Sequence, residues 1–152
     1  MDSATPLSRY RVRAMRQALE TLAFRTDGTG LYEITEEVAG WLQGTGIDTG
    51  LLTLFCRHTS AGLLITENAS PAVQRDLLRW LGQAVPEAGD YEHSAEGADD
   101  MPAHIKAMLT GDSLTVPVSG GQAVLGTWQG IFLAEHRRAP HRRTVVAHVA
   151  GD

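Results

Sequence analysis

The sequence predicts a single α+β domain whose sheet is mainly antiparallel. Segments with strand patterns lie at both ends of the chain and helical segments lie between them, an order typical of α+β proteins. The 152 residues are the length of one domain with one core. We therefore expect an N-terminal arm over residues 1–15, which we expect to be mobile, and a folded domain over residues 16–152.

Six segments have the apolar or alternating pattern of strands. The first ends at an Asp-Gly turn, and the second and third are buried runs joined by a tight link. The fifth is long and contains glycines at which it can bend. These segments cover residues 17–26, 50–58, 62–68, 113–118, 122–137 and 143–150.

Three segments between the strands are predicted to be helices, the first two because their apolar residues have helical spacing. The first has Thr35 as a plausible N-cap and Gly44 as a residue that can end it. The second follows Ser70, begins at Pro71 and carries an apolar side that we expect to face inward, Trp80 included. The third begins at one of the two aspartates in "ADDMPAHIKA", with its proline in the first turn.

Charge and composition exclude several classes of function. A formal net charge of -5 argues against a nucleic-acid partner, and the basic clusters at residues 9–16 and 137–143 suit one small anion better than a polymer. Cys56 is the one cysteine, so no intrachain disulfide forms. No apolar run reaches the roughly 18–20 residues that span a bilayer. We therefore expect a cytoplasmic protein without a membrane partner.

His58 stands at the end of an apolar row that contains Leu52, Leu54 and Cys56, because side chains alternate along a strand. It is either a ligand or acid/base group at a strand end, or a half-buried histidine bonded to a neighbouring carbonyl. Thr59 and Ser60 follow it. Cys56 is expected to be a small core residue rather than a nucleophile.

Two carboxylates and a polar pair on the long strand also stand out. Glu67 continues an apolar row, so it is paired, binds a metal or has reached the strand end, where it and His58 are expected to converge. Asp76 lies between two arginines and reads as a surface ion-pair residue. Thr127 and Gln129 interrupt an apolar face, so either backbone groups satisfy them or they face a polar cavity.

The segment "ADDMPAHIKA" carries Asp100 and His104 four residues apart on one helix face, with Lys106 along another. Asp100 either pairs with His104 and raises its basicity, or orients it as a carboxylate orients a metal-bound histidine. With His93 just upstream, the three histidines at 58, 93 and 104 have the right number for a three-ligand metal site with an open position.

Three strings together resemble the YjbQ-like family (UPF0047), often labelled "secondary thiamine-phosphate synthase". They are "HTSAGLLITEN", "YEHSAEGADDMPAHIK" and "SLTVPVSGGQAVLGTWQGIFLAEHR", and the resemblance runs from about Gln17 to Gly151. Thr66 departs from the asparagine that the family usually has before the glutamate, which puts one polar contact in doubt. The segment "HRRAPHRR" departs from the Gly/Ser-rich turn commonly found there.

The resemblance implies a compact α+β fold with a curved, largely antiparallel sheet or sandwich and about three flanking helices. It also implies a homotrimer whose shared polar residues form a pocket at or near a subunit boundary, where a metal or an anion can sit. Carried over by position, the site residues are His58, His93 and His104 for the metal, Glu67, Asp76 and Lys106 for catalysis, and Thr59, Ser60, Thr127, Trp128 and Gln129 for the substrate.

Two functions follow as expectations. The first is a trimeric enzyme with a divalent metal, Zn²⁺ rather than Mg²⁺ because of its histidines, acting on a small phosphorylated or anionic substrate with weak thiamine-phosphate synthase activity. Glu67 would be its general acid/base, and Lys106 with Gln129 would contact the anion. The alternative is a non-catalytic metal- or ligand-binding protein, and under a third reading the polar residues mainly hold subunits together.

Overall fold

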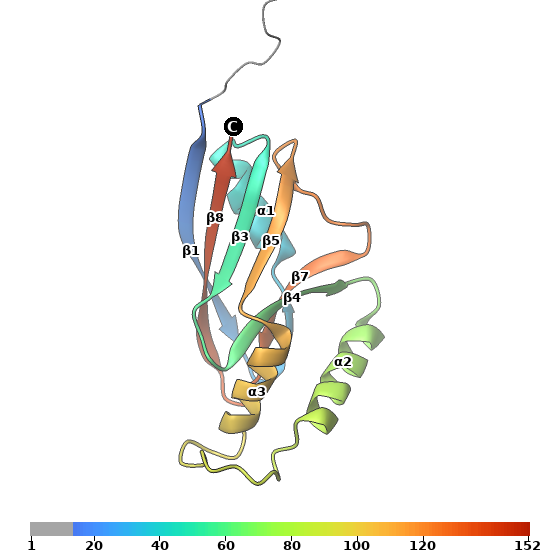
Figure 1. Cartoon of the computed structure of the whole chain (residues 1–152). Coiled ribbons are helices and arrows are strands. Elements are labelled where there is room, and N and C mark those ends of the chain that lie inside the picture. The colour runs from blue at the N-terminus through green and yellow to red at the C-terminus, as the bar shows by residue number, and fades with distance from the viewer. Residues whose placement is uncertain (1–13) are drawn as a thin grey trace, which may run out of the picture.

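The computed structural model, which describes residues 14–152, contains two antiparallel sheets around one core (Figure 1). The larger sheet has the strand order β1-β8-β3-β5-β6 and the smaller has β2-β7-β4. The α+β prediction is confirmed. The strands are β1 (Arg16–Thr26), β2 (Gly30–Glu33), β3 (Gly50–Cys56), β4 (Ala61–Glu67), β5 (Ser113–Ser119), β6 (Gln122–Ala123), β7 (Gln129–Glu135) and β8 (His141–Gly151).

Three helices accompany the sheets. In Figure 1, α1 lies behind the larger sheet, whereas α2 and α3 lie together at the end of the molecule opposite the C-terminus. α3 follows a long loop and packs on β4. The helices are α1 (Thr35–Thr45), α2 (Pro71–Ala84) and α3 (Asp100–Thr110).

The core lies between the inner faces of the sheets and α1. On β3 the predicted alternation is confirmed, because Leu52, Leu54 and Cys56 are buried while Leu51 and Phe55 are exposed. The whole buried cluster draws on both sheets and on α1: Ile34, Val38, Leu42, Ile47, Leu52, Leu54, Cys56, Ala61, Leu63, Val118, Ile131, Leu133, Val145, Ala147 and Val149.

The long strand predicted over residues 122–137 is wrong. It divides into β6, at the edge of the larger sheet, and β7, at the centre of the smaller one. A tight turn separates them, in which the Gln129 amide donates to the Gly126 carbonyl and the Gln129 side chain accepts from the Gly126 amide. Thr127 and Gln129 are therefore exposed at this turn and do not interrupt a buried face.

The helix ends also differ from prediction. α1 runs to Thr45 and is capped by Gly46, whose φ of 69° is left-handed, rather than ending at Gly44. The N-cap of α1 is Ile34 and not the predicted Thr35, whose hydroxyl donates to Glu33, and neither α1 nor α2 has a side-chain N-cap hydrogen bond. Trp80 of α2 is 60% exposed rather than inward-facing.

One strand was not predicted. β2 has four residues, too few to give a clear alternation, and it forms by pairing with β7. The arm predicted over residues 1–15 falls almost wholly outside the described residues. Among the described helices, none combines the length and apolar character that crossing a membrane requires.

Candidate metal centre

Two histidines and an aspartate meet at the start of α3. His93 Nε2 lies 2.7 Å from Asp100 Oδ2, and His104 Nε2 lies 3.1 Å from the same oxygen. One ligand atom from each residue lies within 4.8 Å of the others. Zn²⁺ with ligands at about 2.1 Å separates them by roughly 3.4 Å in a tetrahedron, so small shifts convert this cluster into a three-ligand site.

The backbone fixes which His104 nitrogen faces Asp100. His104 Nδ1 lies 2.8 Å from the Thr59 carbonyl oxygen, which only accepts, so Nδ1 carries a proton. In a neutral ring Nε2 then presents a lone pair to a carboxylate oxygen. That contact is favourable when a cation, either a second ring proton or a metal ion, lies between the two atoms.

Asp100 is held on its other side by Arg137. Arg137 Nη1 donates to Asp100 Oδ1 at 2.7 Å, and Arg137 Nε donates to Asp99 Oδ2 at 3.1 Å. Burial of Asp100 favours its neutral form, but the His93 hydrogen bond and the charges of His104 and Arg137 outweigh burial and lower its pKa. The carboxylate is thus ionised and oriented, as a metal ligand must be.

A cavity of about 690 Å³ opens beside the cluster. Its wall includes the His104 ring, Thr59 and His58, with Asp112 and Met108 on other sides. A ligand in this cavity would therefore meet the ring of His104, the one member of the cluster that lines it. The volume suits a small molecule rather than a polymer.

His58 lines the cavity but does not join His93 and His104 in the cluster, so the predicted set of three histidines is not brought together. The His58 Nε2 atom is also occupied. Nε2 accepts from the Thr144 backbone amide at 2.8 Å, so a neutral ring carries its proton on Nδ1. Burial and then the charge of Arg143 lower the His58 pKa. Cys56, two residues earlier, is buried, which raises the pKa of its thiol, so it fits its predicted place in the core.

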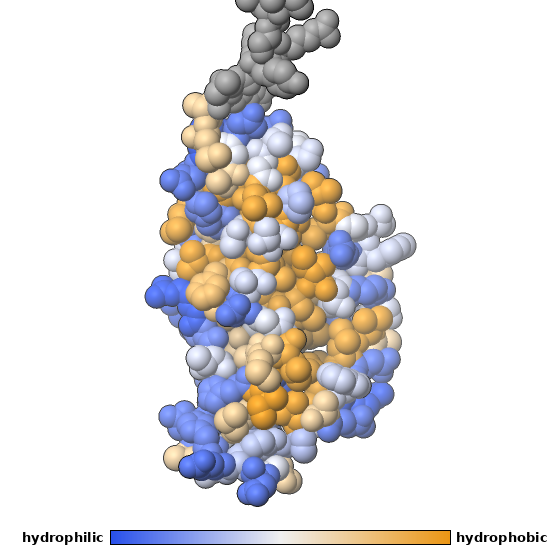
Figure 2. Space-filling view, viewed as in Figure 1, coloured by the Kyte–Doolittle hydropathy of each residue, from blue (hydrophilic) through white to orange (hydrophobic). Residues whose placement is uncertain are grey.

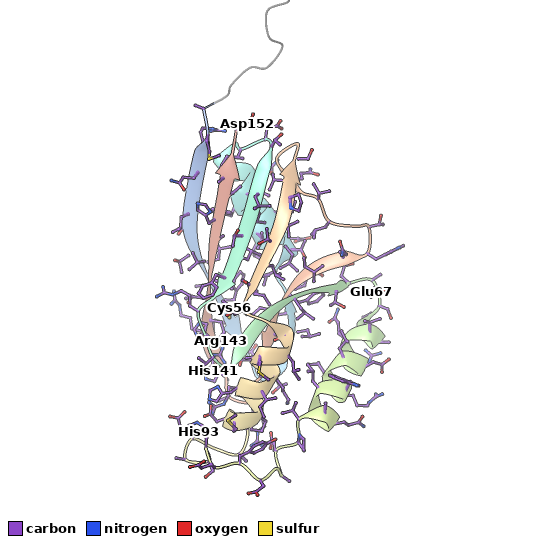
Figure 3. All side chains as sticks on the ribbon, in the orientation of Figure 1. Cys56, Glu67, His93, His141, Arg143 and Asp152 are labelled. Carbon is purple, nitrogen blue, oxygen red and sulfur yellow. The ribbon has the colours of Figure 1, made fainter. Side chains whose placement is uncertain are left out.

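Several other predicted site residues lie far from the histidines. Glu67 ends β4 opposite Gln129 and accepts from the Ser70 amide, while His104 contacts Thr59 before β4 begins. The seven residues of β4 separate these ends by roughly 20 Å. Figure 3 places Glu67 and His93 at opposite ends of the smaller sheet and α3. The expected convergence of Glu67 with His58 within one chain is therefore wrong.

The remaining predicted residues have other contacts. Asp76 pairs with Arg79 on the exposed face of α2, as expected for a surface ion-pair residue. Ser60 is buried, and its hydroxyl accepts from Arg143. Trp128 is 64% exposed in the turn with Thr127 and Gln129. Lys106 is half-buried on α3, where its charge adds to the effect of burial in lowering the pKa of His136.

Two residues have larger roles at the cluster than the sequence predicts. Asp100 was expected to orient His104, yet its oxygen stands among the candidate ligand atoms. Arg137 was seen only as part of a basic cluster. In the sequence, the two carboxylates lie in "ADD" and the arginine that binds both lies in "EHRR". These two charged motifs are the sequence feature that could have indicated the contact.

Comparison with known proteins agrees with the fold and the sequence motifs. A Synechocystis UPF0047 protein is 49% identical over 138 residues, 90% of this chain and 94% of its own. The UPF0047 protein YjbQ of Escherichia coli is 42% identical, covering 88% and 97%. A YbjQ-like protein of unknown function from Sulfolobus solfataricus has the same fold, with a TM-score of 0.85 and 24% identity over 91% and 100%.

The family match covers the described elements almost completely. It runs from residue 20, within β1, to residue 152, and so includes both histidine motifs and the β7 segment. The chain belongs to the family described as UPF0047 protein YjbQ-like.

Proposed function

We propose that His93, Asp100 and His104 bind a divalent metal ion, Zn²⁺ in preference to Mg²⁺, next to a cavity that takes a small phosphorylated or anionic substrate. The observation that carries the proposal is the hydrogen bond from His104 Nδ1 to the Thr59 carbonyl, which turns Nε2 toward Asp100 Oδ2 as the nitrogen that can coordinate a metal. Two imidazoles with one carboxylate suit zinc, whereas magnesium prefers oxygen ligands and water. Three protein ligands leave a position open for a substrate oxygen.

His58 is the further histidine predicted for this site. A bound ligand would reach its ring across the same cavity wall, so we assign it to substrate contact or to a more distant metal position. A resident metal would act as a Lewis acid on a phosphoryl or other anionic oxygen. That chemistry would fit the thiamine-phosphate synthase activity that the family resemblance implies, in which a pyrimidine pyrophosphate couples to a thiazole phosphate and pyrophosphate leaves.

Assembly into a homotrimer would bring Glu67 and Gln129, which lie far from the histidines within one chain, close to the histidines of a neighbouring subunit. Leu19, Leu51 and Phe55 are 67%, 48% and 45% exposed on the outer face of the larger sheet, and Figure 2 has apolar surface across that side. Apolar patches of this kind commonly mark subunit interfaces. In the assembly we propose, the end of β4 with Glu67 and Gln129 of one subunit approaches the histidines of another, with Lys106 beside them.

The lone, buried Cys56 supports a cytoplasmic location.

Metal analysis of the purified protein tests the proposal. We expect about one zinc per chain, lost in His104→Ala and in His93→Ala. His148→Ala is the matched control, because His148 lies on β8 and, within residues 14–152, its ring contacts Gln17 and no residue of the cluster. Folding of each variant is checked by circular dichroism. A wild-type protein that takes up no stoichiometric zinc from a metal-containing buffer would exclude the site.

A second experiment separates enzyme from binding protein. Thiazole phosphate coupling is measured for wild type, Glu67→Gln and His104→Ala, with the sedimentation coefficient of each. An enzyme with Glu67 as its acid/base loses turnover in Glu67→Gln while metal content and assembly remain. A wild-type protein that holds metal but shows no turnover favours the binding protein. A variant that loses only its assembly favours the structural role.

A further inference from the structure

The start of β8 carries a second group of basic side chains. In the register of β1 and β8, Arg25 stands directly opposite Arg142, and Thr26 stands opposite His141. Like charges directly opposite one another in an antiparallel pair are destabilising. The sheet therefore holds an unfavourable pair of charges at a defined position.

No carboxylate among the described residues compensates these arginines. The ion pairs of the region involve other arginines: Arg137 binds Asp99 and Asp100, Arg138 pairs with Glu87, and Arg143 binds Glu135. The contrast between neighbours is clear, since Arg143 points inward to a carboxylate while Arg142 is exposed without one. The chain has five more negative than positive charges in total, so this local excess of positive charge is not a reflection of composition.

The two arginines line a hollow that can hold a ligand. A cavity of about 290 Å³ is walled by Arg25, Pro140, His141 and Arg142. His141 Nδ1 donates to the Ala139 carbonyl at 2.7 Å, which fixes the ring and leaves Nε2 available. The two strands are paired here, so Arg25 and Arg142 project from the same face of the sheet, and His141, at the start of β8, borders the same cavity.

We propose that Arg25, Arg142 and His141 form a binding site for the phosphate group of a small molecule. Two guanidinium forks supply paired donors that match phosphate oxygens, and they gain most where no protein carboxylate competes. The site lies at the same end of the molecule as the histidine cluster, as the positions of His141 and His93 in Figure 3 indicate. It needs neither the metal nor any activity of that cluster. A polyanion is disfavoured because the rest of the protein is acidic.

Phosphate titration of the full-length protein tests this site. Inorganic phosphate and glycerol phosphate are added at constant ionic strength, and binding is followed by amide and Arg Nε–H NMR shifts and by the melting temperature. We expect saturable binding with the largest shifts at Arg25, His141 and Arg142. Arg25→Gln and Arg142→Gln should each weaken it about tenfold. Arg75→Gln, an exposed arginine on α2, should leave it unchanged.

The melting temperature distinguishes a binding site from a structural role. Without phosphate, Arg142→Gln should melt at the wild-type temperature or above, because a repulsion has been removed. With phosphate, the wild type should gain stability and the variant should not. Phosphate shifts that are non-saturable, or equal in Arg75→Gln and Arg142→Gln, overturn the proposal. Tighter binding of a thymidine oligonucleotide through the same arginines overturns the assignment to a small molecule.

Discussion

Arg143 and Glu135 form a doubly hydrogen-bonded ion pair that joins the two sheets. Arg143 Nη2 lies 2.5 Å from Glu135 Oε1, and Arg143 Nε lies 2.6 Å from Oε2. Both side chains are almost inaccessible to solvent. Thr26 donates to Glu135, and Ser60 accepts from Arg143, so the pair is fully satisfied beside the segment whose Thr59 carbonyl positions His104.

Breaking this pair is expected to destabilise the fold strongly. Glu135→Ala leaves the Arg143 guanidinium buried without a counter-charge, which typically costs about 3–5 kcal/mol. The free energy of unfolding from urea denaturation measures the loss. Asp76→Ala is the control, since it removes an ion pair whose side chains are 66% and 71% exposed and should cost less than about 1 kcal/mol. Equal losses in the two variants would contradict a structural role for the buried pair.

His136 makes the stability depend on pH below neutrality. The residue is 2% exposed, and burial, with the charge of Lys106 next, lowers its pKa to about 4. Because the folded pKa lies below the ordinary 6.5, the unfolded chain gains a proton first as the pH falls. The stabilisation is thus complete above pH 6.5 and is lost as the pH falls from 6.5 towards 4.

Replacing His136 should flatten that pH dependence. The full effect across the window is on the order of 3 kcal/mol. Its Nε2 lies 3.1 Å from the Thr110 hydroxyl, so Gln can keep a donor there. Urea denaturation at pH 6.5, 5.5 and 4.5 compares the slopes. His58, whose pKa is also lowered, keeps its own share of the dependence in His136→Gln. An unchanged slope in the variant would disprove the assignment to His136.

Two glycines should respond in opposite directions to alanine. Gly82 lies within α2 with open space around its Cβ position, so Gly82→Ala should raise the free energy of unfolding by about 0.5–1 kcal/mol. A Cβ at Gly50 would overlap the backbone carbonyl of Ala150 on the paired strand. Gly50→Ala should therefore cost about 1–3 kcal/mol. Thermal and urea denaturation of both variants provide the comparison, and a stabilised Gly50→Ala would refute this packing.

Local sequence patterns predicted the elements that depend on local chemistry. The period of apolar residues predicted the first two helices and most strands, the aspartates and the proline predicted the start of the third helix, and the motif around His104 indicated where His93 and His104 meet, though not with His58. Local patterns did not predict the features that depend on contacts between residues far apart in the sequence. β2 forms by pairing with β7, which is distant in the sequence. Glu67 lies far from His58 because the seven residues of β4 extend between them. The Arg137 contact with Asp100 joins residues 37 apart, which spacing along a helix cannot reveal.

Arg137 should tune the metal affinity of the candidate centre without being a ligand. Its hydrogen bond to Asp100 Oδ1 fixes the carboxylate whose other oxygen faces both histidines. Removing such an orienting partner typically lowers metal affinity about 10–100-fold. Arg137→Met also removes a positive charge, which by itself favours cation binding, so a control must remove an equal charge nearby.

Arg138→Met is that control. Its guanidinium pairs with Glu87 at 3.4 Å and has no contact with Asp100. Competition with a chromophoric zinc chelator measures both affinities at equal ionic strength. We expect Arg137→Met to bind zinc about 10–100-fold more weakly than wild type, and Arg138→Met to bind it equally or slightly more tightly. If both variants gain affinity alike, the guanidinium of Arg137 acts only as a charge, and the orientation of Asp100 arises from the helix and from His93.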